Sequence, residues 1–310
     1  MSGALGGPAW RDSLENCAML AQLRGDPMLG TAFPASRILL IEQPGPWGRG
    51  GLRESQFDPR IAARLERDLG AANVRVVAIR RPGRRPSAQP RRWGFADCRP
   101  GRESLVWGEF VADGELLELD PSADVIATSA AAAIPDRAPT YLVCAHSRHD
   151  PCCALRGRPV AAALAAARPG RVWECSHIGG ERFAANVLVL PVGLVYGRIL
   201  SFSAAEFADV ADRGEVVPAL LRGRVGLPPA AQAAAAFGYA LEEAPKASDV
   251  QVLSVDSTDP AHVLVRVATP QGAMEISVLV ERSSPAKLTC QATGPATAWV
   301  YRPVEIRPAA

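Results

Sequence analysis

Residues 140–181 read TYLVCAHSRHDPCCALRGRPVAAALAAARPGRVWECSHIGGE. Within this stretch, Thr140–Val143 and Arg171–Cys175 predict two buried strands. Between them, Arg158–Ala167 is rich in helix-forming alanine, with Pro159 in its first turn and an Arg-Pro-Gly stop signal after it. The order strand, helix, strand is the unit from which α/β sheets are built.

The same stretch concentrates the thiols and imidazoles of the chain, since four of the seven cysteines and three of the four histidines lie between residues 144 and 177. Cys144 follows the first strand, and Cys175 and His177 stand at the end of the second. Because neighbouring parallel strands end at the same edge of a sheet, we expect the two groups to meet. Thiolate and imidazole are ligands for zinc and for iron–sulfur clusters. Gly179 and Gly180 would let the backbone approach a bulky inorganic centre and donate N–H bonds to its sulfides.

The segments on either side carry related patterns. Arg37–Glu42 and Asn73–Ile79 predict buried strands, with a helix between them that begins at the N-cap Asp58. After the central stretch, Val187–Leu190 and Leu194–Ile199 predict a hairpin. The order of elements is that of a thioredoxin-like layout, preceded by a related α/β segment.

The C-terminal part has a different period. Apolar residues alternate at Val263, Val265 and Val267, and again from Met274 to Val280, as in half-buried strands. We therefore expect an α/β protein that ends in a small antiparallel β-rich segment. The expected parts are an N-terminal α/β domain over residues 1–135, a thioredoxin-like domain over 136–240 and the β-rich segment over 245–310.

The composition bounds the class of protein. Hydrophobic residues make up 48% of the 310 residues and charged ones 21%, which is enough apolar surface for real cores and excludes a disordered chain. The net charge of +2 argues against a dedicated nucleic-acid binder, and the longest apolar stretches fall short of a bilayer span. Met1–Trp10 lacks the features of a signal peptide. We therefore expect a cytoplasmic protein without nucleic-acid or membrane partners.

The cysteine count is odd, and without a signal peptide a disulfide framework is the poorer interpretation. Cys17, Cys98 and Cys290 are scattered over the other segments and are interpreted as packing residues, because an isolated buried cysteine behaves as a small hydrophobe. The sequence contains neither a Gly-x-x-x-x-Gly-Lys phosphate loop nor a Gly-x-Ser-x-Gly nucleophile elbow. The cysteine and histidine cluster is therefore the candidate site.

Several short motifs surround this cluster. They are Cys144-x-His, Asp150-x-Cys-Cys, Gly157-x-Pro-Val, Trp173-Glu-x-Ser-His-x-Gly-Gly, Arg182-Phe-Ala-x-Asn, Leu190-Pro and Tyr196-Gly-Arg. Together they closely resemble the sucrase/ferredoxin-like family, and the segment Glu42–Gly48 (EQPGPWG) does so as well. The similarity extends over about residues 13 to 240.

The resemblance implies a thioredoxin-like ferredoxin domain that carries a 2Fe–2S cluster on two cysteines and two histidines, spaced Cys-x8-Cys and His-x3-His. The matching positions hold Cys144, Cys153, His177 and, in place of the second histidine, Glu181. The fourth ligand is therefore open between Glu181, which stands in the matching position, and the neighbouring thiol of Cys152. Cys175 is a weaker alternative, and the cluster could also be labile or lost.

Neighbouring residues could support the cluster. The residues expected around the cofactor are Gly179, Gly180 and Arg182, with Asn186 as a further brace of the glycine turn. For His146, Arg148, His149 and Asp150 two interpretations stay open, namely hydrogen bonds around the site or exposure in the loop.

These inferences favour a 2Fe–2S electron-transfer protein, a carrier rather than an enzyme with its own substrate, that works with a redox partner protein as donor or acceptor.

One alternative is a cluster-free thiol-redox protein of thioredoxin type, cycling a disulfide between Cys144 and Cys152 or Cys153; the lack of a Cys-x-x-Cys site counts against it. The other is a structural zinc site, which suits the same ligands. A carbohydrate hydrolase is the weakest interpretation, because no motif marks a carboxylate pair. If Glu181 replaces a neutral imidazole on the cluster, its negative charge should lower the reduction potential.

Overall fold

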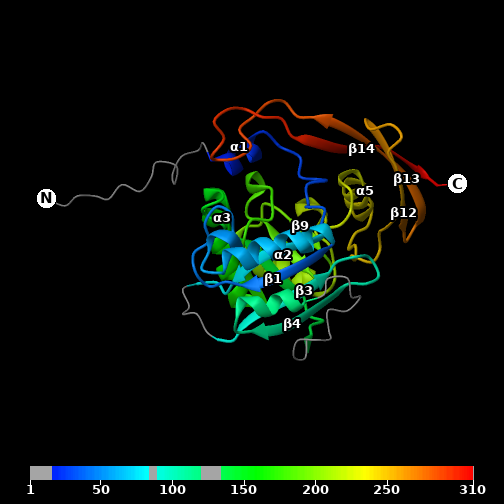
Figure 1. Ribbon diagram of the computed structural model, residues 1–310. Helices are drawn as coiled ribbons and strands as arrows, with labels where there is room; N and C mark the ends of the chain where they lie inside the picture. The colour runs from blue at the N-terminus through cyan, green and yellow to red at the C-terminus, as the bar shows by residue number, and fades with distance from the viewer. Residues whose placement is uncertain (1–15, 84–88, 120–133, 310) are drawn as a thin grey trace.

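The strands form two sheets in the computed structural model, which describes residues 16–83, 89–119 and 134–309 (Figure 1). The large sheet contains β1 (Arg37–Glu42), β2 (Val74–Arg80), β3 (Arg91–Asp97), β4 (Ser104–Phe110), β5 (Ile134–Pro135), β6 (Thr140–Cys144), β7 (Val172–Cys175), β8 (Val187–Leu190), β9 (Leu194–Tyr196) and β10 (Leu221–Arg224). The small sheet contains β11 (Gln251–Asp256), β12 (His262–Thr269), β13 (Gly272–Arg282) and β14 (Trp299–Pro308). The α-helices in the described residues are α1 (Cys17–Leu23), α2 (Pro59–Ala71), α3 (Pro151–Ala167), α4 (Ala204–Asp212) and α5 (Pro229–Tyr239). The segment Met1–Trp10 lies outside the described residues.

The large sheet is built from two copies of one topology. In the first copy, α2 joins the parallel strands β1 and β2, and β3 and β4 continue antiparallel beside β1, which gives the order β2-β1-β3-β4. The second copy has the order β7-β6-β8-β9, with α3 joining the parallel pair β6 and β7. The copies meet where β2 and β7 pair antiparallel, with Ile79 opposite Cys175. This arrangement confirms the predicted α/β class, with a related α/β segment ahead of the central one.

Helix α3 begins at Pro151, well before the predicted start at Arg158, which was wrong. Asp150 supplies the N-cap, since its carboxylate accepts a hydrogen bond from the N–H of Cys152 at 2.8 Å, and Pro151 fills the first position, where no donor is needed. Pro159 therefore lies inside the helix, where it removes one backbone hydrogen bond. As a result, Cys152 and Cys153 stand in the first turn of a helix.

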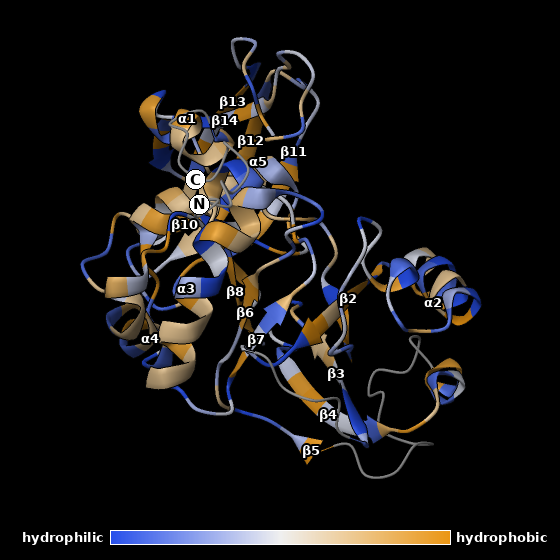
Figure 2. Cartoon of the chain, turned by 90° about the vertical axis from the view of Figure 1, so that its left-hand side faces the viewer, coloured by the Kyte–Doolittle hydropathy of each residue, from blue (hydrophilic) through white to orange (hydrophobic). Residues whose placement is uncertain are grey.

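Apolar side chains pack against the large sheet, whose central strands β6 and β8 are buried throughout. Helix α2 buries Ala62, Leu65 and Leu69 against the first copy and turns its polar side outward (Figure 2). No helix within the described ranges combines the length and the apolar character that crossing a bilayer requires.

The small antiparallel sheet confirms the predicted β-rich segment and packs on α5 (Figure 1). Helix α5 is rich in alanine and almost entirely buried, and its small side chains let it contact both β10 and the strands β12–β14. Val189 and Leu194 of the large sheet belong to the same buried cluster as Val265 and Val278 of the small sheet. Between β13 and β14 the chain passes beside α1 through residues 283–298, where the N–H of Cys17 contacts the Sγ of Cys290 (Figure 1).

Candidate metal centre

Three of the residues predicted as ligands meet where β6 and β7 end. The Nδ1 atom of His177 lies 3.9 Å from the Sγ of Cys144 and 3.7 Å from the Sγ of Cys153. Both cysteines are buried, and the side chain of His177 is 15% exposed. Cys144 ends β6 opposite Cys175 in the parallel pair, so the loop after β7 carries His177 to the same edge of the sheet. Two thiols and one imidazole thus have ligand atoms within 4.8 Å of one another.

A close contact between α3 and β6 keeps the two sulfurs together. Gly157 lies on the face of α3 that meets β6, and a Cβ atom there would overlap the carbonyl oxygen of Cys144. Glycine therefore lets the helix lie this near to the end of the strand. Cys153, one turn earlier in α3, is held against Cys144 by the same contact.

The protonation states of the three side chains are linked. A hydrogen bond from the Cys153 thiol holds the pKa of Cys144 well below its usual range, and His177 adds to this effect against the opposing effect of burial. The same pairing, together with burial, raises the pKa of Cys153. Burial lowers the pKa of His177, but its hydrogen bonds to Cys144 and Glu181 outweigh burial and raise it to about 9. Cys144 is thus the thiolate of the group, stabilised by two donors.

Glu181 and His149 lie beside the other nitrogen of His177. The Oε2 atom of Glu181 is 3.4 Å from the Nε2 of His177. The ring of His149 stacks on the ring of His177, with centroids 3.7 Å apart and an angle of 18° between the planes. The ligand atoms of these three residues lie within 4.8 Å of one another, so they form a second donor group that shares His177 with the first. The sequence left His149 open between hydrogen bonds around the site and exposure in the loop, and the structure places it against His177.

Asn186 and Arg222 hold the glycine turn that follows His177. Gly179 and Gly180 have φ angles of +82° and +71°, a conformation that glycine adopts readily. The Nδ2 of Asn186 donates to the carbonyl oxygen of Gly180 at 2.7 Å, as the sequence suggested. The Nη1 of Arg222 donates to the carbonyl oxygen of Gly179 at 3.0 Å and to the Oδ1 of Asn186 at 2.9 Å. Arg222 is fully buried on β10, and sequence reasoning missed it because no local motif marks it.

Arg182 has other contacts. Its guanidinium lies 4.4 Å from the centre of the Phe183 ring, and its Nε is 3.8 Å from a carboxylate oxygen of Asp26. The structure therefore directs Arg182 toward the end of α1, and the bracing expected of it is provided by Asn186 and Arg222.

His146 ties the first copy of the topology to the candidate site. Its Nε2–H donates to the carbonyl oxygen of Gly48 at 2.6 Å, and its Nδ1 accepts the backbone N–H of His177 at 3.2 Å. These two bonds select one neutral tautomer, and burial lowers the pKa of His146 in the same sense. The Nη2 of Arg75 adds a bond of 2.8 Å to the carbonyl oxygen of His177. The backbone of His177 is thus fixed from both sides.

The structure does not bring Cys152 into this centre. Its Sγ lies 3.3 Å from the Sγ of Cys290 and 3.6 Å from the Sγ of Cys17. Cys17 and Cys290 are packed in one apolar cluster with Cys152, in line with their interpretation as packing residues, but they are not scattered, because the fold brings them together. Cys98 lies in the buried core, as predicted. Cys175, the weaker candidate for the fourth ligand, also lies in the core and belongs to neither donor group around His177 among the described residues.

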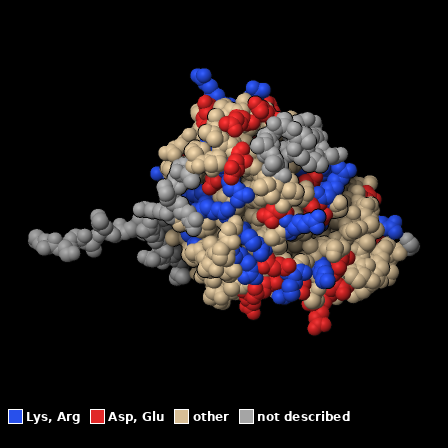
Figure 3. Space-filling view, turned by 90° about the horizontal axis from the view of Figure 1, so that it is seen from below, with Lys and Arg blue, Asp and Glu red and all other residues tan. Residues whose placement is uncertain are grey.

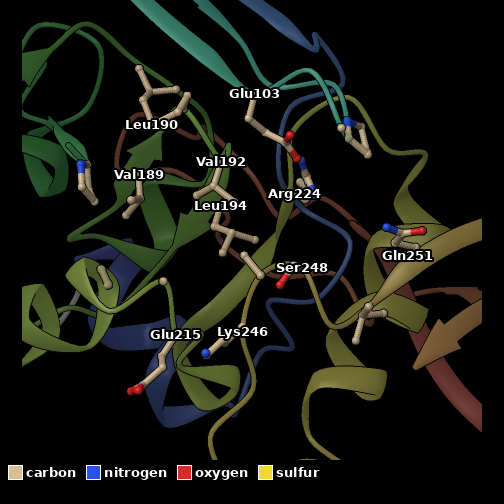
Figure 4. A pocket seen from close by; sticks show the side chains of 18 of the residues that line it. Glu103, Val189, Leu190, Val192, Leu194, Glu215, Arg224, Lys246, Ser248 and Gln251 are labelled. Atoms are coloured by element: carbon tan, nitrogen blue, oxygen red, sulfur yellow. The ribbon is translucent and has the colours of Figure 1, made fainter. Parts of the chain in front are cut away.

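A cavity of about 450 Å³ lies apart from the metal centre (Figure 4). It is lined by apolar residues such as Leu190 and Leu194 and by the ion pair of Arg224 with Glu103. No residue of either donor group lines it. The face seen from below mixes cationic and anionic side chains without separation into single-sign areas (Figure 3). We assign no role to either feature.

Comparison with known proteins identifies one family. A family model described as sucrase/ferredoxin-like matches residues 28–223, which is more than half of the chain. The match includes every residue of the two donor groups around His177, whereas Cys17 and Cys290 lie outside it. No curated protein and no solved structure matches the chain significantly.

Proposed function

The chain belongs to the sucrase/ferredoxin-like family, and from this premise we propose that it is an electron-transfer protein with a 2Fe–2S cluster held by cysteine and histidine ligands. The observation that carries the proposal is the meeting of Cys144, Cys153 and His177 within ligand distance. When bound, such a cluster supplies one-electron chemistry.

The donor set offers ligands for a two-iron group. Around His177 there are two adjoining groups, one with two sulfurs and the other with a second imidazole and a carboxylate. A cluster takes ligands on two sides, and two thiolates on one iron with imidazole on the other is established chemistry for 2Fe–2S centres.

For the fourth ligand we favour Glu181. Its carboxylate lies beside the Nε2 of His177 and stands where the family pattern has histidine. His149 is the second candidate, because its ring stacks on that of His177 and its nitrogen shares the same donor group. Cys152 is no longer favoured, since its sulfur contacts Cys17 and Cys290.

The exposed edge of the site gives the route for the electron. The side chains of His177 and Glu181 are 15% and 14% exposed, whereas Cys144 and Cys153 are buried. A redox partner protein would therefore dock over the histidine side.

Two arginines of this chain would tune the potential. Arg75 bonds the carbonyl oxygen of His177, and the buried Arg222 bonds that of Gly179. Positive charge held this near stabilises added negative charge, so both residues would raise the reduction potential and partly offset an anionic ligand.

The test is the iron and acid-labile sulfide content of the full chain after anaerobic purification. We expect two irons and two sulfides per chain in the wild type, strong loss in Glu181→Ala, and retention in His149→Ala. Cys98→Ala, which changes a buried cysteine of the core, is the matched control. If His149→Ala loses iron and Glu181→Ala does not, the fourth ligand is His149.

Other outcomes would support the alternatives. If the wild type contains zinc instead of iron, and Cys144→Ala loses that zinc, the site is a structural zinc site and not a cluster. A metal-free, colourless protein that reduces disulfides would support the thiol-redox alternative. All seven cysteines are free in the structure, which supports the proposal of a reducing, cytoplasmic location.

A further inference from the structure

We propose that Cys17, Cys152, Cys290 and Asp150 form a second metal site, which binds one zinc ion and ties α1 and the connection between β13 and β14 to the start of α3. The proposal does not depend on the 2Fe–2S cluster. Cys17 and Cys290 lie outside the segment that matches the family.

The three sulfurs form a nearly regular triangle. The Sγ–Sγ distances are 3.3 Å between Cys152 and Cys290, 3.5 Å between Cys290 and Cys17, and 3.6 Å between Cys17 and Cys152. Sulfurs on a tetrahedral zinc, with Zn–S bonds of about 2.3 Å, lie about 3.8 Å apart. Each sulfur would need to move only by a few tenths of an ångström to bind the ion.

Asp150 supplies a fourth ligand to the triangle. Both of its carboxylate oxygens lie 3.9 Å from the Sγ of Cys17. Oδ1 accepts the N–H of Cys152 and Oδ2 accepts the N–H of Cys290, each at 2.8 Å. These bonds fix the carboxylate and leave each oxygen a further lone pair, as required of a zinc ligand.

The buried carboxylate of Asp150 among the three thiols favours a bound cation. Cys17, Cys152 and Asp150 are each 1% exposed or less, and Cys290 is only partly exposed. In the described part of the chain, the hydrogen-bond partners of the Asp150 carboxylate are backbone N–H groups and thiols. A buried carboxylate is costly without a cationic partner, and a zinc ion supplies one while it turns the neighbouring thiols into bound thiolates.

The site also accounts for the long connection between β13 and β14. Residues 283–298 contain no helix or strand beyond one isolated bridge, between Ala286 and Ala296. Unstructured connections of this length are uncommon in compact proteins unless something ties them down. Cys290 makes that tie, since its N–H bonds Asp150 and its sulfur accepts the N–H of Cys17 at 3.4 Å. In Figure 1 this connection runs beside α1, and the bond from Cys290 to Asp150 ties it to the start of α3.

The test is the zinc content per chain of full-length protein expressed with zinc in the medium. We expect one zinc ion in the wild type and in Cys98→Ala, and its loss in Cys290→Ser and Cys17→Ser, with the iron and sulfide content of Cys290→Ser unchanged. Conversely, Cys144→Ala should lose iron and keep this zinc, so the two proposals can fail separately. A wild-type chain without zinc, or zinc that persists in both Cys290→Ser and Cys17→Ser, would overturn the site.

Alkylation tests the same site in the wild-type protein, so the result does not depend on whether a variant folds. With zinc bound, Cys17, Cys152 and Cys290 should resist iodoacetamide, and a chelator should expose these three and leave Cys98 protected. Equal labelling before and after chelation would contradict the proposal.

Discussion

Cys152 and Cys153 are neighbours in the sequence, yet their sulfurs belong to different groups. The Sγ of Cys153 lies 3.7 Å from the Nδ1 of His177, and the Sγ of Cys152 lies 3.3 Å from the Sγ of Cys290. Consecutive residues of a helix point about 100° apart, so the first turn of α3 offers one thiol to each group. The adjacent thiols should therefore be separable by mutation.

Cys153→Ala should lose most of its iron and its visible absorbance, because it removes a sulfur from the group around His177. Cys152→Ala should keep both, because the sulfur it removes faces Cys17 and Cys290. Absorbance spectra of the two variants at equal protein concentration make the comparison. Equal loss in both would show that Cys152 also serves the cluster.

Gly157→Ala should separate α3 from β6, since the new methyl group would overlap the carbonyl oxygen of Cys144. We expect a loss of about 1–3 kcal/mol in the free energy of unfolding, together with reduced iron loading. Gly70→Ala in α2 is the matched control, because a Cβ there meets open space and should stabilise the helix by about 0.5–1 kcal/mol. Urea denaturation measures the free energy of unfolding of both variants. A Gly157→Ala variant as stable as the wild type would contradict the close contact.

Glu181→His should raise the reduction potential, on the order of 100 mV, because a neutral ligand replaces an anionic one. The potential should also depend more steeply on pH, since a second imidazole could then take up a proton. Redox titration at several pH values measures both effects. A potential equal to or below that of the wild type would remove Glu181 from the ligand set.

Asp212 links stability to pH far from the metal centre. Burial raises the pKa of its carboxyl, but hydrogen bonds from Tyr141, at 2.6 Å, and from Arg171 and Arg168 outweigh burial and hold it below the usual value. A lowered pKa contributes stability above the unfolded pKa of about 3.9, and this contribution is lost as the pH falls through the folded pKa.

Asp212→Asn should therefore cost about 1 kcal/mol at pH 7, and the difference from the wild type should hold down to about pH 5 and shrink as the pH falls further, through the folded pKa. Asp68→Asn, at an exposed position of α2, is the control and should change the free energy of unfolding little at pH 7. Unfolding measured across this pH range decides the point. A difference that stays constant with pH would contradict the linkage.

The sequence predicts the parts of the site that depend on local order. Thr140–Val143 leads directly into Cys144, and the second strand leads into His177, so the rule that parallel strands end together is enough to bring them to one edge. The start of α3 was harder, because Pro159 resembles a first-turn proline. The N-cap bond of Asp150 and the proline after it decide the start.

Local sequence patterns did not predict the contacts between segments that are distant in the sequence. Cys17 and Cys290 meet only because the C-terminal connection passes beside α1, and nothing in the neighbourhood of either residue indicates it. Arg222 reaches the glycine turn from β10 for the same reason. The related α/β segment was expected, but the sequence did not indicate that the two copies share the same order of strands.

Low-temperature electron paramagnetic resonance of the reduced, anaerobically purified chain tests the central proposal most directly. We expect a rhombic signal of one spin per chain, with coupling to the nitrogen of His177 that disappears in His177→Ala. A wild-type protein that gives no signal on reduction and contains zinc but no iron would contradict the assignment of a 2Fe–2S electron carrier.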